Sequence, residues 1–80
     1  MTMAEAVMIR TRNLLKEREV SLHKFLKDNC IPRTTLINLE TGHTKSPGLS
    51  LVFQIAEGFG MTHLEFLNDP IFFSDELEYM

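Results

Sequence analysis

Apolar residues along the chain recur mostly at intervals of three and four, which is the spacing of one face of an α-helix. Over about residues 4–18, the positions that share one such face are Val7, Thr11, Leu14, Leu15 and Arg18. No stretch of useful length alternates between apolar and polar residues, as a half-buried strand would. The pattern therefore predicts an all-α fold that begins with this helix.

The segment SLHKFLKDNCIPRTTLINLETG, residues 21–42, predicts two short helices joined by a tight turn. Ser21 is a favourable N-cap, and Val20 before it can pack on Phe25 as a hydrophobic staple. Pro32 suits the first turn of the second helix, and Gly42 can take the left-handed conformation that ends it. Helices this short with so few residues between them must cross steeply, as in a helix-turn-helix, whose second helix can enter the DNA major groove.

The same segment carries an ordered set of residues, which are Ser21, Phe25, Ile31, Leu36, Leu39, Glu40 and Gly42. In this register the chain resembles the Cro and phage-repressor-like (XRE-type) helix-turn-helix family. The likeness continues through a loop at 44–47, a fourth helix at about 49–59 and a fifth after Gly60, where Thr62 and Glu65 form a capping-box pattern. It implies a five-helix lambda-repressor-like DNA-binding domain over residues 1–68. Residues 69–80 lie beyond the resemblance and form a short apolar and acidic tail.

Two positions near the turn depart from the family pattern. Leu22 stands where many members have a glutamine that braces a phosphate, so that contact is lost or passes to a backbone N–H. Cys30 replaces the glycine of the turn. Because cysteine is strained in the left-handed region, we expect the turn to shift onto Asn29, which tolerates that conformation better.

A third departure concerns an ion pair that the resemblance implies. Leu15 occupies the position at which many members carry an arginine that pairs with the glutamate of the third helix, here Glu40. Arg12 lies one turn earlier on nearly the same face. We therefore expect Glu40 to be at least partly buried and to pair with Arg12, because a carboxylate against the core without a partner is costly.

The charge of the chain is unevenly distributed. The formal net charge is −3, yet all eight Lys and Arg residues lie in residues 1–48, where five acids leave a balance of +3. Residues 49–80 hold six acids and no Lys or Arg, a balance of −6. One end could therefore meet DNA phosphates while the other would be repelled by them. The alternative is that both are ordinary solvated surfaces.

The resemblance places the recognition helix at about Pro32–Thr41. Its candidate base-contacting residues are Arg33, Thr34, Ile37 and Asn38. Arg33 can bond guanine O6 and N7 together, Asn38 can make the paired contact to adenine, and Thr34 or Ile37 can touch a thymine methyl. The alternative is that these are simply surface residues of a short helix.

Candidate contacts to the DNA backbone are small polar or basic residues near helix N-termini and in the loop after the recognition helix. They are Ser21, His23, Lys24, Thr35, Thr41, His43, Thr44 and Lys45. For Lys24 and Lys27, the alternative is a role in solubility alone.

Catalytic and ligand-binding patterns are weak. His23, His43 and His63 fall on different predicted elements, and Cys30 has no neighbouring base in the sequence. We therefore expect no enzymatic activity, catalytic residue, metal, cofactor or small-molecule ligand. A single cysteine suits the reducing cytoplasm, and no apolar run approaches the length of a membrane span.

The sequence thus predicts a bacterial or phage transcriptional regulator that binds double-stranded DNA in a sequence-specific manner. Apolar residues make the tail unsuited to a free end, and they are Ile71, Phe72, Phe73, Leu77 and Tyr79. The tail either folds back on its own domain or enters a partner subunit, and we expect a homodimer through the fifth helix and this tail. The alternatives are a protein-interaction module of the same fold and the antitoxin of a toxin–antitoxin pair, whose tail would grip the toxin.

Overall fold

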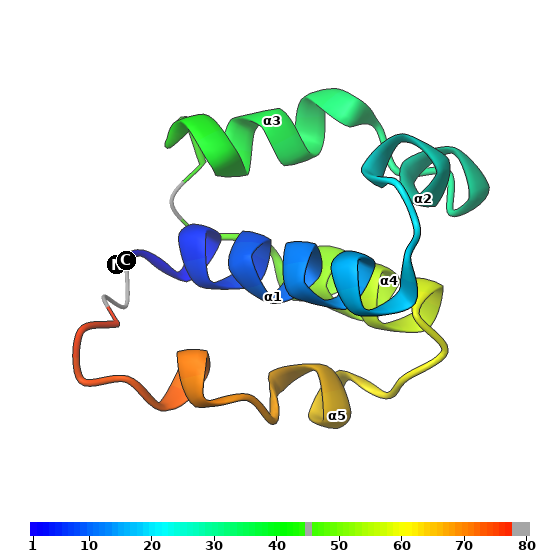
Figure 1. The fold of residues 1–80 in the computed structure, drawn as a ribbon. Helices are drawn as coiled ribbons and strands as arrows, with labels where there is room; N and C mark the ends of the chain where they lie inside the picture. The colour runs from blue at the N-terminus through cyan, green and yellow to red at the C-terminus, as the bar shows by residue number, and fades with distance from the viewer. Residues whose placement is uncertain (45, 78–80) are drawn as a thin grey trace.

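The helices follow one another in the predicted order. A computed structural model describes residues 1–44 and 46–77. Its elements are α1 (Met3–Arg18), α2 (Leu22–Asp28), α3 (Arg33–Thr41), α4 (Leu49–Gly58), α5 (His63–Leu67) and the 3₁₀ helix η1 (Pro70–Phe73). This described part contains no β-strand, so the all-α fold class is confirmed. Figure 1 shows α1 and α4 in the middle of the molecule, with α3 on one side and α5 and η1 on the opposite side.

The predicted helix starts are made by side-chain caps. Ser21 Oγ accepts a hydrogen bond from the Lys24 N–H (3.2 Å) at the start of α2. At α5, Thr62 Oγ1 accepts from the Glu65 N–H (3.2 Å), and the Glu65 carboxylate accepts from the Thr62 N–H (3.1 Å). The capping box expected there is therefore present. Pro32 lies one position before the first turn of α3, as its extended N-cap.

The turn between α2 and α3 corrects the expectation for Asn29. Cys30 takes the left-handed conformation (φ 55°), whereas Asn29 has a φ of −107°. The Ile31 N–H donates to the Leu26 carbonyl (3.0 Å), as in a Schellman motif, which needs a left-handed residue just before Ile31. Asn29 is also held by its own side chain, whose Nδ2 donates to the Phe25 carbonyl (2.8 Å). The closure of the helix end therefore decides which residue is strained.

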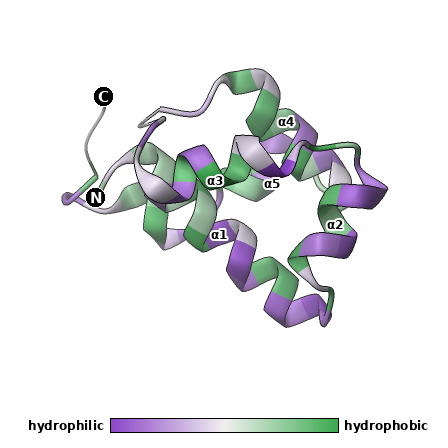
Figure 2. Cartoon of the chain, turned by 90° about the horizontal axis from the view of Figure 1, so that it is seen from above, coloured by the Kyte–Doolittle hydropathy of each residue, from purple (hydrophilic) through white to green (hydrophobic). Residues whose placement is uncertain are grey.

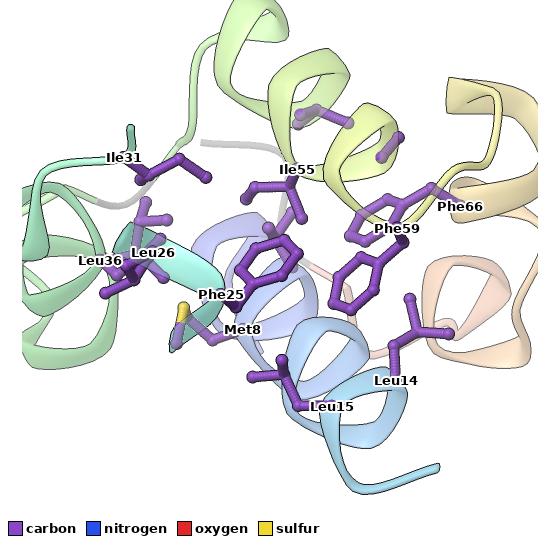
Figure 3. Close-up of a cluster of buried hydrophobic side chains, with 14 of the residues drawn as sticks. Met8, Leu14, Leu15, Phe25, Leu26, Ile31, Leu36, Ile55, Phe59 and Phe66 are labelled. Carbon is purple, nitrogen blue, oxygen red and sulfur yellow. The ribbon is translucent and has the colours of Figure 1, made fainter. Parts of the chain in front are cut away.

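The hydrophobic core draws on all five α-helices. In Figure 3, side chains from α1, α2, α4 and α5 converge around Phe25 and Phe59, whose rings stack with centroids 4.3 Å apart. The residues predicted to share the inner face of α1 are buried except Arg18. Arg18 is exposed, as a charged group at the edge of the core requires, and its guanidinium lies over the Phe59 ring, 5.3 Å from the centroid, and donates to the Phe59 carbonyl. Figure 2 shows hydrophilic and hydrophobic residues alternating along α1 and α2, as amphipathic helices require.

Gly58 permits the close approach of α2 to the end of α4. A Cβ at this position would lie 2.8 Å from Asn29 Cγ and 2.9 Å from Phe25 Cζ. These distances are too short for non-bonded carbon atoms, so the absence of a side chain is what allows this packing. The sequence had indicated only that Gly58 weakens α4 as a helix.

The described part of the tail folds back on its own domain. Phe72 packs against the core, with its ring centroid 6.0 Å from that of Phe66, and Leu77 is buried. Arg10 of α1 fastens this region by donating to the Phe66 carbonyl (2.9 Å) and to Asp69 (3.2 Å). Residues 78–80, which include Tyr79, lie outside the described residues.

Candidate nucleic-acid interface

Helix α3 separates its apolar and polar side chains onto two sides. Leu36 and Leu39 are each 1% exposed and anchor α3 in the core. Arg33, Thr34 and Ile37 are exposed, and Asn38 is half-buried. The predicted outward position of Arg33 is therefore confirmed, while Asn38 is less exposed than expected. The candidate base-contacting residues thus lie apart from the core side of α3, and Arg33 makes no hydrogen bond or ion pair within residues 1–44 and 46–77.

A hollow of about 400 Å³ lies between α2 and the start of α3. Its lining residues are Leu22, His23, Leu26, Lys27, Ile31 and Arg33. Leu22 forms part of its apolar wall, so the side chain at this departure from the family pattern packs and offers no polar group. The basic and imidazole groups of His23, Lys27 and Arg33 line the same hollow. The spacing of four residues between His23 and Lys27 places them on one side of α2, which was a signal available in the sequence for adding Lys27 to the candidates.

The candidate backbone contacts fall at the two ends of the α2–α3 pair. At one end, Ser21 is engaged as a helix cap, and Lys24 pairs with Asp28 (3.1 Å) at a position where both side chains are mostly exposed. At the other end, Thr41 Oγ1 donates to the Ile37 carbonyl (2.8 Å) and lies 2.9 Å from His43 Nδ1. Ser21 Oγ only accepts in its cap bond, so its O–H can still donate to a phosphate. The Thr41 O–H already donates to the Ile37 carbonyl and would have to rotate away from it to contact a phosphate.

The remaining candidates differ in exposure. Thr35 and Thr44 are half-buried, and the Thr44 N–H donates to the Asn38 carbonyl (2.9 Å), which ties the loop back onto α3. His23 and His43 are exposed. Lys45 lies outside the described residues.

The expected Arg12–Glu40 ion pair is present and joins α1 to α3. Its burial differs from the expectation, because the two side chains are 48% and 49% exposed. The pair lies beside a shallow hollow lined by Glu5, Met8 and Ile9, at the outer edge of the α1–α3 contact. It is thus a surface pair that keeps the net charge near the C-terminal end of α3 close to zero.

Arg10 and Arg18 bond carbonyl groups of the protein's own backbone. Arg10 donates to the carbonyls of Phe66 (2.9 Å) and Glu65 (3.2 Å), and Arg18 donates to the Phe59 carbonyl. These contacts join residues more than forty positions apart. No local pattern in the sequence indicates them. The basic half of the chain therefore presents less free charge toward α3 than its composition indicates.

We also searched the described residues for metal sites and membrane-spanning helices. Within 1–44 and 46–77, no three side chains of His, Cys, Asp or Glu come together in a way that could hold a metal ion. No helix in this part of the chain is long and apolar enough to span a membrane. Comparison with models of protein families, with curated proteins and with solved structures finds no match to this chain.

Proposed function

We propose that the chain binds double-stranded DNA in a sequence-specific manner through α3, as a helix-turn-helix regulator of transcription. The observation that carries the proposal is the exposed row of Arg33, Thr34 and Ile37 on a helix whose opposite side is anchored by Leu36 and Leu39. A short helix held this way can enter a major groove, where the exposed side chains reach base edges. α2 supports it across the turn at residues 29–32.

The role of each side chain follows from its chemistry. Arg33 carries the bidentate donors that recognise guanine, and Ile37 supplies an apolar surface for a thymine methyl. Asn38 contributes a second bidentate contact, for which its side chain must extend from its half-buried position. His23, Lys24 and Lys27 on α2 and the polar residues after α3 would contact the flanking phosphates.

The proposal extends to the place of action and the assembly of the protein. A DNA-binding regulator acts in the cytoplasm of a bacterium, or on a phage genome within one, and needs no catalytic group, metal or cofactor. Homodimerisation through α5 and the tail stays a prediction, and so does the antitoxin alternative. DNA binding at α3 is compatible with each of them, because α5 and η1 lie on the opposite side of the molecule (Figure 1).

The test is a gel-shift titration against pools of random-sequence duplexes at two salt concentrations, followed by selection of the bound sequences. The chain should enrich a short motif, and its affinity should fall steeply as salt rises, because phosphate contacts release counterions. Failure to shift any duplex at either salt concentration would contradict the proposal.

A pair of matched variants separates base contacts from phosphate contacts. Arg33→Ala should cost about 1–3 kcal/mol of binding free energy on the selected motif and relax the preference at one position. Lys24→Ala should weaken binding evenly across sequences and reduce the salt slope by about 1. An even loss from Arg33→Ala would instead identify Arg33 as a phosphate contact.

A further inference from the structure

Large apolar side chains are exposed on the last three helices, α4, α5 and η1. Four of the six large apolar side chains exposed in the described residues belong to the last three helices, and they are Leu49, Phe53, Leu64 and Phe73. Leu64 and Phe73 are 69% and 68% exposed. Exposure of this degree by two large side chains of so small a domain is typical of a binding surface.

A ring stack and a shared hollow group these side chains. Phe53 stacks on His63 with ring centroids 4.2 Å apart, and Leu64 follows His63 on α5. Leu64 and Phe73 line a single open hollow of about 470 Å³ together with Glu65, Leu67 and Asn68. We name this surface the α4–α5 apolar face and define it by Leu49, Phe53, His63, Leu64 and Phe73. It extends from α4 across α5 to η1.

The charged side chains that surround this face are acidic. Glu57 lies one turn after Phe53 on α4, Glu65 lines the hollow, and Asp75 and Glu76 follow Phe73 after Ser74, all four acids being exposed. Residues 49–80 contain no Lys or Arg. The α4–α5 apolar face therefore has an acidic rim.

Arg10 of α1 reaches this region, but its guanidinium is directed into the protein. The Arg10 side chain is 12% exposed, and its guanidinium is bonded to the Phe66 and Glu65 carbonyls and to Asp69. It therefore does little to offset the negative rim toward solvent. Asp69 is the acid that it neutralises. The Met1 amino group, which donates to the Glu76 carbonyl (3.0 Å), brings one positive charge to a rim with four exposed acids, so the rim stays negative.

The sign of the rim selects the occupant. In the two-fold dimer through α5 and the tail that the sequence predicts, this patch would meet itself, so acidic rims would face acidic rims at a cost in free energy, and the rim favours another occupant over that dimer. Nucleic acid and anionic lipid headgroups would be repelled for the same reason. We propose that the α4–α5 apolar face binds a protein segment whose apolar side chains are flanked by Lys or Arg. This contact leaves α3 free and does not depend on DNA binding.

The probe for this proposal is a designed amphipathic helical peptide built from leucine and lysine, with a leucine–glutamate peptide of the same length and pattern as its control. In titrations of the ¹⁵N-labelled chain followed by NMR, the lysine peptide should shift the amides of Phe53, Leu64 and Phe73, with an affinity that falls as salt rises. The glutamate peptide should leave these amides unmoved, because its charges match those of the rim.

Matched variants test the location of the contact. Leu64→Ala combined with Phe73→Ala should lower the affinity for the lysine peptide at least about tenfold, the scale of a few lost apolar contacts. Ile37→Ala, which removes a comparably exposed apolar side chain from α3, should leave this affinity unchanged. Thermal melting of each variant verifies that it is folded.

Three results would overturn the proposal. They are equal binding of both peptides, peptide-induced shifts centred on α3, and a homodimer in sedimentation equilibrium that Leu64→Ala with Phe73→Ala converts to monomer. Binding of the selected duplex by the same double variant is measured in parallel. Since α3 is untouched in that variant, loss of peptide binding with retained DNA binding separates this proposal from the proposed function.

Discussion

At the scale of single residues, Cys30 and Gly58 show how the contact between α2 and its neighbours constrains individual positions. Cys30 is left-handed because the end of α2 closes through the Ile31 N–H, and Gly58 lacks a side chain where α2 meets α4. In both cases the packing of α2 decides which backbone conformation or side chain the position can have. At each position we predict a substitution whose effect on stability is opposite to the one that helix propensity alone would indicate.

Cys30→Gly should stabilise the protein by about 0.5–1 kcal/mol, because it relieves a left-handed conformation worth roughly 1–2 kcal/mol at the cost of some chain entropy. Urea denaturation of the reduced protein measures the change. Cys30→Val serves as the control and should be destabilising, since a β-branched residue tolerates a φ of 55° poorly. A Gly variant less stable than the parent would show that the thiol contributes more than the strain removes.

Gly58→Ala should lower the free energy of unfolding by about 1–2 kcal/mol, although alanine is the better helix former. The added Cβ would lie within 2.9 Å of atoms of Asn29 and Phe25. The measurement is a double-mutant cycle with Asn29→Ala, in which the cost of Gly58→Ala should shrink once the Asn29 side chain is removed. Equal costs in the two backgrounds would place the clash elsewhere.

At the scale of elements, the parts that were predictable from sequence are those with local causes. The starts of α2 and α5 follow from Ser21 and from the Thr62–Glu65 pair, and the burial of Leu36 and Leu39 follows from their spacing. These signals lie within a few residues of the structure they determine.

The errors and omissions have long-range or competing causes. Asn29 has the better left-handed preference, yet the hydrogen-bond pattern at the end of α2 places that conformation on Cys30. The bonds of Arg10 to α5 depend on how the chain folds back over 55 residues or more. For the candidate site, the sequence indicated the helix and the outward position of Arg33, but not the inward use of Arg10.

The prediction at the scale of elements concerns the contribution of the Arg12–Glu40 ion pair, between α1 and α3, to stability. Arg12 and Glu40 are both about half exposed, so water screens their attraction. Arg12→Ala should therefore lower the free energy of unfolding by less than about 1 kcal/mol, and added salt should reduce the difference. A double-mutant cycle with Glu40→Ala isolates the pair, and a coupling energy well above that limit would mean that the pair is buried in solution.

At the scale of the whole molecule, the described tail closes the side of the domain that lies opposite α3. Phe72 packs on the core beside Phe66, Leu77 is buried, and the amino group of Met1 donates to the Glu76 carbonyl (3.0 Å). The two ends of the described chain are thereby joined across a domain with a radius of gyration of 11.8 Å. In so small a domain, each buried apolar side chain is a substantial part of the stability.

The adjacent residues Phe72 and Phe73 offer a matched pair for testing this closure, because one faces the core and the other is 68% exposed. Phe72→Ala should lower the free energy of unfolding by about 2 kcal/mol, less than the roughly 3–5 kcal/mol of a fully buried phenylalanine. Phe73→Ala should change it by no more than about 0.5 kcal/mol. Truncation after Pro70 should lower the free energy of unfolding by more than Phe72→Ala does, since it also removes Leu77.

Guanidinium denaturation of the three variants checks this order. Equal stabilities for the two alanine variants would mean that the tail does not hold its packed position in solution. The apolar surface beside α5 would then be larger than the structure shows.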